Sequence, residues 1–287
     1  MTDDAAARAA GILEVHDADR VRTLTMNRPD ALNAFNGALY RELAAALYAA
    51  DEDPGVAVVL LTGRGRAFSA GTDLVEMAEL VASGGGGGEG DGDGGGGDDA
   101  LSATEEHGFN VLVDALIAFS KPLVAAVNGL GLGIGVTLLG FVDLAFISEG
   151  AKLKCPFTSL GVAPEAASSF LIPRLVGHQN AAWVLLSSEW ISAEQAHEMG
   201  LVWKLCTPDE LMPTATEHAT RLAALPVSSL RGVKRAMTEP VAQQVAEARR
   251  RENGMFAQLL GGPANTEALA AFAEGRKPDF TALPDGA

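Results

Sequence analysis

Short apolar runs separated by glycine-rich turns fill the first two thirds of the chain. Runs at 12–16 and 20–26 predict a pair of strands around a turn at 17–19. Further strands are predicted at 56–62, 124–127, 143–148, 152–155 and 202–206. The run at 56–62 is apolar at nearly every position, which is typical of a strand buried on both faces. The pattern therefore indicates a sheet with a buried centre.

Helical spacing appears between and after these strands. Asn36 precedes apolar residues at Leu39, Leu43 and Leu47, which predicts a capped amphipathic helix. Other segments with helical spacing before residue 206 are 72–82, 104–120, 136–142, 179–188 and 192–199, whereas 157–177 is rich in loop-forming residues. Beyond residue 206 no strand pattern remains, and helices are predicted at 208–225, 227–238, 240–260 and 263–274. We therefore expect an α/β body at 1–206 and a helical region at 207–287.

Composition and charge narrow the classes of partner. The chain has 287 residues, 48% of them hydrophobic, and a formal net charge of -16, so it can bury a large core. This acidity disfavours binding to nucleic acid or to an anionic membrane. Cys155 and Cys206 show no metal-binding spacing, and residues 1–10 lack a secretory signal pattern. We expect a cytoplasmic protein without a metal site.

A run of glycine and acidic residues, GGGGGEGDGDGGGGDD, occupies 84–99. Glycine has no side chain to bury and the acids repel one another, so a disordered loop is expected. It is either a tolerated surface insertion or a flap beside a ligand channel.

Two glycine-containing turns each join a predicted strand to a predicted helix. The first is AFSAGTDL at 67–74, and the second is NGLGLGIGVTLL at 128–139. The start of a helix leaves backbone N–H groups unpaired, and such donors can hold a phosphate or an oxygen that gains charge in a reaction. The alternative is that the glycines serve only the close packing of helix on strand.

The chain resembles the crotonase superfamily, also called the enoyl-CoA hydratase/isomerase family. The motifs that carry the resemblance are NRPDALNAFN, GRAFSAGTDL, KPLVAAVNGLGLGIG, SLGVAP and FAEGRKPDF. It implies an α/β spiral of ββα units with a C-terminal helical trimerisation region, and hence a homotrimer or a dimer of trimers. It also implies an acyl-CoA thioester as substrate, with coenzyme A as part of that substrate and no separate cofactor.

The resemblance implies roles for individual residues. The backbone N–H groups of Thr72 and Ile134 would form an oxyanion hole for the thioester carbonyl. Lys277 and Phe280 resemble tail residues that close over coenzyme A, often from a neighbouring subunit. The remaining expected contacts with acyl-CoA are Ala31, Leu32, Ala70, Gly71, Asp73, Leu74, Gly133, Phe157 and Pro164.

Departures from the family pattern narrow the reaction. Where hydratases carry two catalytic glutamates this chain has Thr137 and Phe157, neither of which is a base at neutral pH. Glu165, in the run PEAASS, resembles the catalytic glutamate of peroxisomal-type Δ3,Δ2-enoyl-CoA isomerases. Such an enzyme moves one proton from C2 to C4 of the substrate, so one carboxylate suffices.

Three functions remain open from the sequence. The first is isomerisation of Δ3-enoyl-CoA to Δ2-trans-enoyl-CoA, a step of fatty acid β-oxidation, with Glu165 as the proton shuttle. The second is another acyl-CoA reaction of this fold, either hydration or thioester hydrolysis. The third is a catalytically silent protein that binds acyl-CoA.

Overall fold

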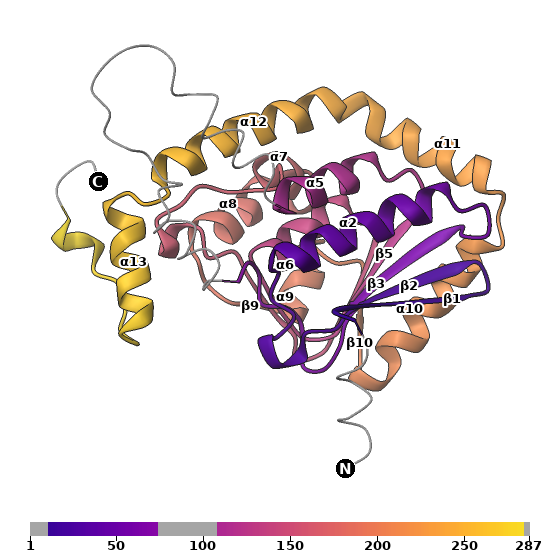
Figure 1. Ribbon diagram of the computed structural model, residues 1–287, viewed down its shortest axis with the longest axis horizontal. Coiled ribbons are helices and arrows are strands. Elements are labelled where there is room, and N and C mark those ends of the chain that lie inside the picture. The colour runs from indigo at the N-terminus through magenta and orange to yellow at the C-terminus, as the bar shows by residue number, and fades with distance from the viewer. Residues whose placement is uncertain (1–10, 74–107, 284–287) are drawn as a thin grey trace.

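A sheet of six strands forms the centre of the described chain, which in this computed structural model comprises residues 11–73 and 108–283 (Figure 1). The strand order is β1-β2-β3-β5-β7-β10, with β1 and β2 antiparallel and every other neighbouring pair parallel. Their bounds are β1 Leu13–Ala18, β2 Val21–Met26, β3 Val58–Gly63, β5 Leu123–Val127, β7 Leu144–Ser148 and β10 Lys204–Cys206. The apolar runs in the sequence thus predicted the central strands.

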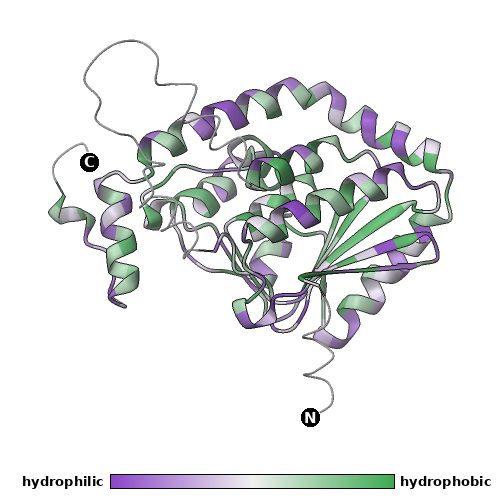
Figure 2. Cartoon of the chain, in the orientation of Figure 1, coloured by the Kyte–Doolittle hydropathy of each residue, from purple (hydrophilic) through white to green (hydrophobic). Residues whose placement is uncertain are grey.

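Helices cover both faces of this sheet. Alternate residues of β3 point in opposite directions, so Val59 and Leu61 join one apolar cluster while Val58 and Leu60 join another. The first cluster lies under α2 (Gly37–Glu52) and α5 (Gly108–Ala118), and the second under α10 (Pro208–Ala223). Figure 2 shows the hydrophobic colour concentrated on the central strands.

The helix α2 follows directly from its sequence. The side chain of Asn36 accepts a hydrogen bond from Leu39 N, which satisfies one of the free donors at the helix start. Leu39, Leu43 and Leu47 then lie on one face and are at most 1% exposed. The expected cap and the expected apolar stripe are both confirmed.

A second, smaller sheet runs beside the first, in the order β4-β6-β8-β9. Its strands are β4 Ala67–Ser69, β6 Leu130–Leu132, β8 Lys152–Lys154 and β9 Ile191–Ser192. The pairs β3/β4, β5/β6 and β7/β8 each place one strand in the large sheet and the next strand in the small one. Repetition of this step along the chain builds the expected spiral of ββα units.

Shorter elements and the C-terminal helices complete the described chain. Before residue 206 they are η1 Pro29–Ala31, α6 Ile134–Thr137, η2 Leu138–Phe141, η3 Thr158–Leu160, α7 Ser168–Val176, α8 His178–Leu186 and α9 Ala193–Glu198. After it they are α11 Val227–Thr238, η4 Glu239–Val241, α12 Ala242–Leu259, α13 Pro263–Ala273 and η5 Phe280–Ala282. Figure 1 shows α11 and α12 along one side of the body and α13 at its end.

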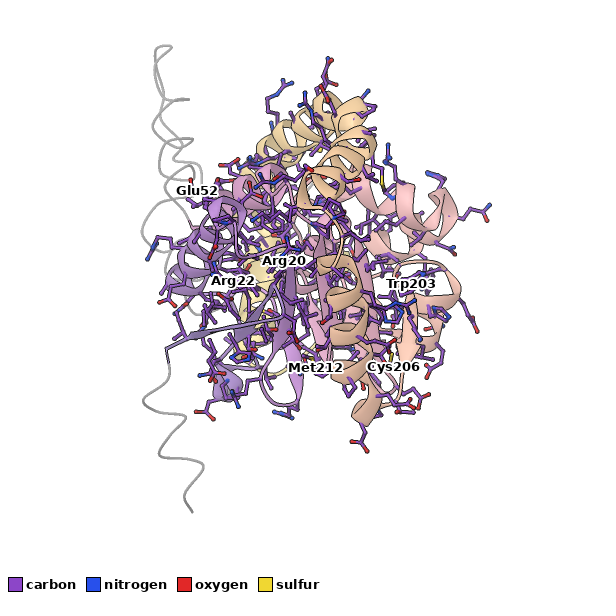
Figure 3. All side chains as sticks on the ribbon, turned by 90° about the vertical axis from the view of Figure 1, so that its right-hand side faces the viewer. Arg20, Arg22, Glu52, Trp203, Cys206 and Met212 are labelled. Atoms are coloured by element: carbon purple, nitrogen blue, oxygen red, sulfur yellow. The ribbon has the colours of Figure 1, made fainter. Side chains whose placement is uncertain are left out.

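The helix α10 belongs with the sheet by its contacts, although it follows residue 206. Leu211, Ala215 and Ala219 are at most 2% exposed against the strands, and Arg20 donates a hydrogen bond of 2.7 Å to the carbonyl of Ala223. Figure 3 shows this helix in front, with Arg20 near one end and Met212 near the other. Of the helices expected in the C-terminal region, the first therefore packs as part of the body.

Some expectations about local structure are wrong. The stretch 157–177 is not mainly loop, because α7 occupies its second half. The turn between β1 and β2 lies at Asp19 and Arg20 rather than at 17–19. The short strands β4, β6 and β9 were not expected, since two or three residues carry no periodic signal. The expected helix at 72–82 and the loop at 84–99 lie almost entirely outside the described residues.

Trimerisation through the C-terminal helices stays a prediction. None of the described helices combines the length and the apolar composition needed to span a bilayer.

Candidate active site

The first glycine bend follows β4, and one of its backbone N–H groups points away from the segment at Phe35 with which the bend pairs. Phe35 N donates to Gly71 O at 2.7 Å, and Asp73 N donates to Phe35 O at 2.9 Å. This parallel bridge uses the groups on either side of Thr72, so the N–H of Thr72 itself points to the opposite side. The hydroxyl of Thr72 lies 2.8 Å from the Tyr40 hydroxyl of α2, which fixes the residue in place.

The second glycine bend links β6 to α6. Gly133 N donates to Lys154 O at 3.0 Å, and Gly133 O accepts from Val136 N at 2.8 Å and from Thr137 N at 3.0 Å. Ile134 is the first residue of the helical turn, so its N–H has no intrahelical acceptor. Within the described chain no acceptor is found for it elsewhere. The second bend thus also presents a free backbone donor.

The two bends touch each other, and only glycine permits the contact. Gly71 has φ 84° and Gly133 has φ 54°, both in the left-handed region. A Cβ atom on Gly71 would lie 2.8 Å from Leu132 O, inside the contact distance of any real side chain. A Cβ atom on Gly133 would lie 3.9 Å from Gly71 Cα. The two bends therefore pack backbone against backbone. Thr72 directly follows Gly71 and Ile134 directly follows Gly133, so both N–H donors lie next to this contact.

Glu165 reaches this contact from the loop before α7. Its Oε1 lies 3.9 Å from the position of a Cβ atom on Gly133. Burial, and secondarily the negative charge of Glu252, raise the pKa of Glu165 to about 8 from its ordinary 4.5. Burial and then the charge of Glu165 raise the pKa of the neighbouring Cys155 thiol. A carboxylate of raised basicity therefore stands beside the glycine bends.

The backbone after Glu165 is strained. Ala166 and Ala167 have φ values of 59° and 54°, a conformation that costs a non-glycine residue about 1–2 kcal/mol each. Both residues are completely buried, and Ser168 N donates to Glu165 O at 3.0 Å. The hydroxyl of Ser168 has no hydrogen-bond partner within the described chain, so it does not orient the carboxylate. Strain of this kind in a native structure often marks a functional site.

The early loop brings two of the expected ligand contacts, Ala31 and Leu32, to the first glycine bend. Ala70 N donates to Leu32 O at 2.9 Å, which joins Ala31 and Leu32 to the first bend. The Asp73 carboxylate lies 3.3 Å from Arg28 and is thus occupied by an ion pair. Through this ion pair, Asp73 links the first glycine bend to the early loop.

Asn33 of the same loop has a structural role that was not predicted from the sequence. It is completely buried, and its side-chain amide donates to the carbonyls of Ala67 at 2.8 Å and Arg64 at 3.0 Å. Its own carbonyl accepts a hydrogen bond of 2.9 Å from the hydroxyl of Ser69. The spacing of asparagines in NRPDALNAFN was the available signal, but these partners lie more than 30 residues away in the chain.

The two positions where the family resemblance places hydratase glutamates are buried and carry no carboxylate. Thr137 is completely buried, with no hydrogen-bond partner for its hydroxyl among the described residues, and Phe157 is 3% exposed as part of the large core cluster. Pro164 is half-buried next to Glu165 in the chain. Leu171 of α7 packs in a separate small apolar cluster with Ala167 and with Val245 and Ala248 of α12.

The tail residues are not joined to this site within one chain. Lys277 is exposed, and hydrogen bonds from Arg276 and from Asp279 N tie the tail to Glu267 of α13. Phe280 is half-buried in η5. Leu74, the remaining expected contact, lies outside the described residues.

Comparison with known proteins gives a consistent family. The family model described as enoyl-CoA hydratase/isomerase matches residues 17–283. Two Escherichia coli proteins are similar over most of their length: 1,2-epoxyphenylacetyl-CoA isomerase is 33% identical over 91% of this chain and 95% of its own, and 2,3-dehydroadipyl-CoA hydratase is 35% identical over the same shares. A solved enoyl-CoA hydratase from Mycobacterium marinum is 57% identical, covers 80% of this chain and 100% of its own, and has a TM-score of 0.69.

Proposed function

The chain belongs to the enoyl-CoA hydratase/isomerase family, and from this premise we propose that it converts Δ3-enoyl-CoA into Δ2-trans-enoyl-CoA. The observation that carries the proposal is the position of Glu165. Its carboxylate lies against the second glycine bend, with a pKa raised to about 8, while Thr137 and Phe157 offer no base. A single half-buried carboxylate of raised pKa suits a reaction in which one proton leaves and returns.

The mechanism begins with the thioester carbonyl. Its oxygen accepts hydrogen bonds from Thr72 N and Ile134 N, each worth about 3–4 kcal/mol when negative charge develops there. Glu165 takes the proton from C2, and the electron pair of that C–H bond delocalises onto the adjacent carbonyl oxygen and, across the C3–C4 double bond, onto C4. The protonated Glu165 then returns the same proton to C4, and a double bond forms between C2 and C3. Charge and atoms balance without water or a cofactor.

The raised pKa of Glu165 serves both halves of this cycle. A carboxylate that protonates near pH 8 is a stronger base toward C2 than an exposed glutamate. Because the ionised form starts the cycle, kcat/KM should rise with pH up to about 8 and then level off.

Binding of the rest of the substrate is proposed from the loop geometry and the family. Ala31, Leu32 and Ala70 are joined by the hydrogen bond between Ala70 N and Leu32 O, and they would line the coenzyme A moiety. Lys277 and Phe280 would close over it from a neighbouring subunit, which needs a homotrimer or a dimer of trimers. A cytoplasmic location is part of the same proposal.

Hydration of a 2-enoyl-CoA is the second candidate. Two similar proteins, from Mycobacterium marinum and Escherichia coli, are described as hydratases, which favours it. The usual hydration mechanism needs a second carboxylate to activate water. Thr137 and Phe157 stand where the family places those carboxylates, so isomerisation is the better supported reaction.

The test is to supply 3-enoyl-CoA and follow the conjugated product, and to supply 2-enoyl-CoA and follow the loss of conjugation. We expect the first reaction only, and a loss of about 10²–10⁴-fold in kcat/KM for Glu165→Gln. Glu198→Gln, which changes an exposed glutamate of α9, is the matched control and should behave as the parent. Full activity in Glu165→Gln would remove the proposed base. Binding of acyl-CoA without any turnover would instead identify a silent binding protein.

A further inference from the structure

A second buried glutamate, Glu252 of α12, lies against α7. It is 2% exposed, and its Oε1 accepts a hydrogen bond of 2.8 Å from Ser169 N. No ion pair joins it to a cation within the described chain. An unpaired buried carboxylate is costly, so its presence needs an explanation.

Part of the explanation is the start of α7. The residue at the N-cap position is Ala167, which has no side-chain acceptor to offer, and the strained Ala166 precedes it. The carboxylate of Glu252 supplies the missing acceptor from a helix 83 residues further along the chain. Glu165 comes immediately before the two alanines, so the direction of its side chain depends on the bend that this hydrogen bond holds.

We propose that Glu252 is a positioning residue for Glu165. From the C-terminal helices it holds the bend at 165–167, and its negative charge makes the Glu165 carboxylate a stronger base. The kinetic part of this inference rests on the proposed isomerisation, whereas the structural and titration parts do not.

The charges around the pair agree with this role. Burial raises the pKa of Glu252, while its contacts with Ser169 and Ala167 and the charge of Arg251 act in the opposite direction. Its charge in turn adds to the effect of burial on the pKa of Glu165.

The other charged or titratable groups near the pair are engaged elsewhere or are neutral. On α12, Arg249 pairs with Asp114 of α5, and on α7, Arg174 lies over the ring of Phe170. Lys154, the last residue of β8, lies over Trp190, and the thiol of the next residue, Cys155, stays protonated because its pKa is raised. Glu252 is therefore the charge of the described chain that bears most directly on Glu165.

The experiment is a titration of substrate-free protein labelled with ¹³C at the glutamate carboxyl, with the Glu165 signal identified by its loss in Glu165→Gln. The variant Glu252→Gln keeps the volume and the acceptor for Ser169 N but removes the charge. We expect its Glu165 midpoint to lie lower by about one pH unit. The control Glu247→Gln removes a half-buried charge that lies 4.0 Å from Arg251 on the same helix, and it should leave the midpoint where it is.

Kinetics supply an independent readout. In Glu252→Gln the pH profile of kcat/KM should shift to lower pH with the titration. Two pH units below the parent midpoint the ionised fraction of Glu165 should rise about tenfold, while the plateau rate falls because the base is weaker. Glu252→Ala removes the acceptor as well, and it should lower kcat at every pH.

Each outcome of these experiments either supports or overturns the proposed role of Glu252. An unchanged midpoint in Glu252→Gln would overturn the inference whatever the enzyme does. A Glu252→Gln protein that fails to fold would also overturn it, because the amide keeps the hydrogen bond on which the bend depends. A lowered midpoint in a protein that isomerises nothing would support the inference and defeat the proposed function.

Discussion

The large sheet and the glycine bends of the small sheet differ in how completely they satisfy their own chemical groups. In β3 and β5 every residue is buried, every side chain but that of Thr62 is apolar or absent, and the backbone groups pair between strands. At the bends, the backbone N–H groups of Thr72 and Ile134 have no acceptor within the described residues. In the segment before α7, Ala166 and Ala167 take a left-handed conformation, Glu165 is half-buried, and the buried Glu252 packs against α7. Stability is therefore concentrated in the large sheet and reactivity in the glycine bends and the segment beside them.

The first way to test this separation is a cavity under α10. Leu60 is completely buried between β3 and α10, so Leu60→Ala should lower the free energy of unfolding by about 3 kcal/mol. The activity of the folded protein at low temperature should stay that of the parent. Urea unfolding and initial rates measure the two effects. Val15→Ala, on an exposed position of the same sheet, is the control and should change stability by less than about 0.5 kcal/mol. A loss of activity in folded Leu60→Ala would show that the two regions are coupled.

The second test is the dependence of stability on pH at Glu165. The folded pKa of about 8 lies above the unfolded value near 4.5, so burial of this group costs nothing below pH 4.5 and increasingly more as the pH rises to 8. Glu165→Gln should therefore be more stable than the parent at pH 8, by about 2–3 kcal/mol after allowance for partial exposure, and no more stable at pH 4.5. Thermal unfolding across this range measures it, with Glu198→Gln as reference. Parallel stability curves for parent and Glu165→Gln would mean that the carboxylate is solvated.

The third test, which has the smallest expected effect on stability, concerns the role of the first glycine bend in catalysis. Gly71→Ala and Gly150→Ala both place alanine at positive φ, 84° and 79°, but only the first meets a neighbour, since nothing lies within 4 Å of a Cβ atom on Gly150. We expect about 2 kcal/mol of destabilisation for Gly71→Ala against about 1 for Gly150→Ala. Only Gly71→Ala should also lose activity, by about 100-fold, because the overlap moves Thr72. Equal kinetic behaviour of the two variants would argue against donors in this bend.

Local patterns predicted what local interactions determine. The helix α2 was predictable because its cap and its apolar stripe lie within a dozen residues of each other. Val124–Val127 was predictable because a strand buried on both faces is apolar without interruption. The candidate site was partly predictable, since Glu165 and both bends stand in recognisable motifs.

What the sequence did not reveal depends on distant partners. The helix α7 follows two left-handed alanines, has no capping side chain of its own and contains Pro173, so the local sequence indicates a loop. Its acceptor, Glu252, sits in the run RRREN, which has the composition of a solvated helix face. Burial of that glutamate follows only from the packing of α12 on α7, which no window of the sequence contains.

The position of α10 has a practical consequence for shortened forms of the protein. A fragment that ends with the last strand would lack α10, and the side chains of Val58, Leu60 and Phe146 would be exposed. This apolar face of the sheet would then be prone to aggregation. Recombinant pieces meant to stay monodisperse should therefore run at least through Ala223, the residue that Arg20 holds against the sheet.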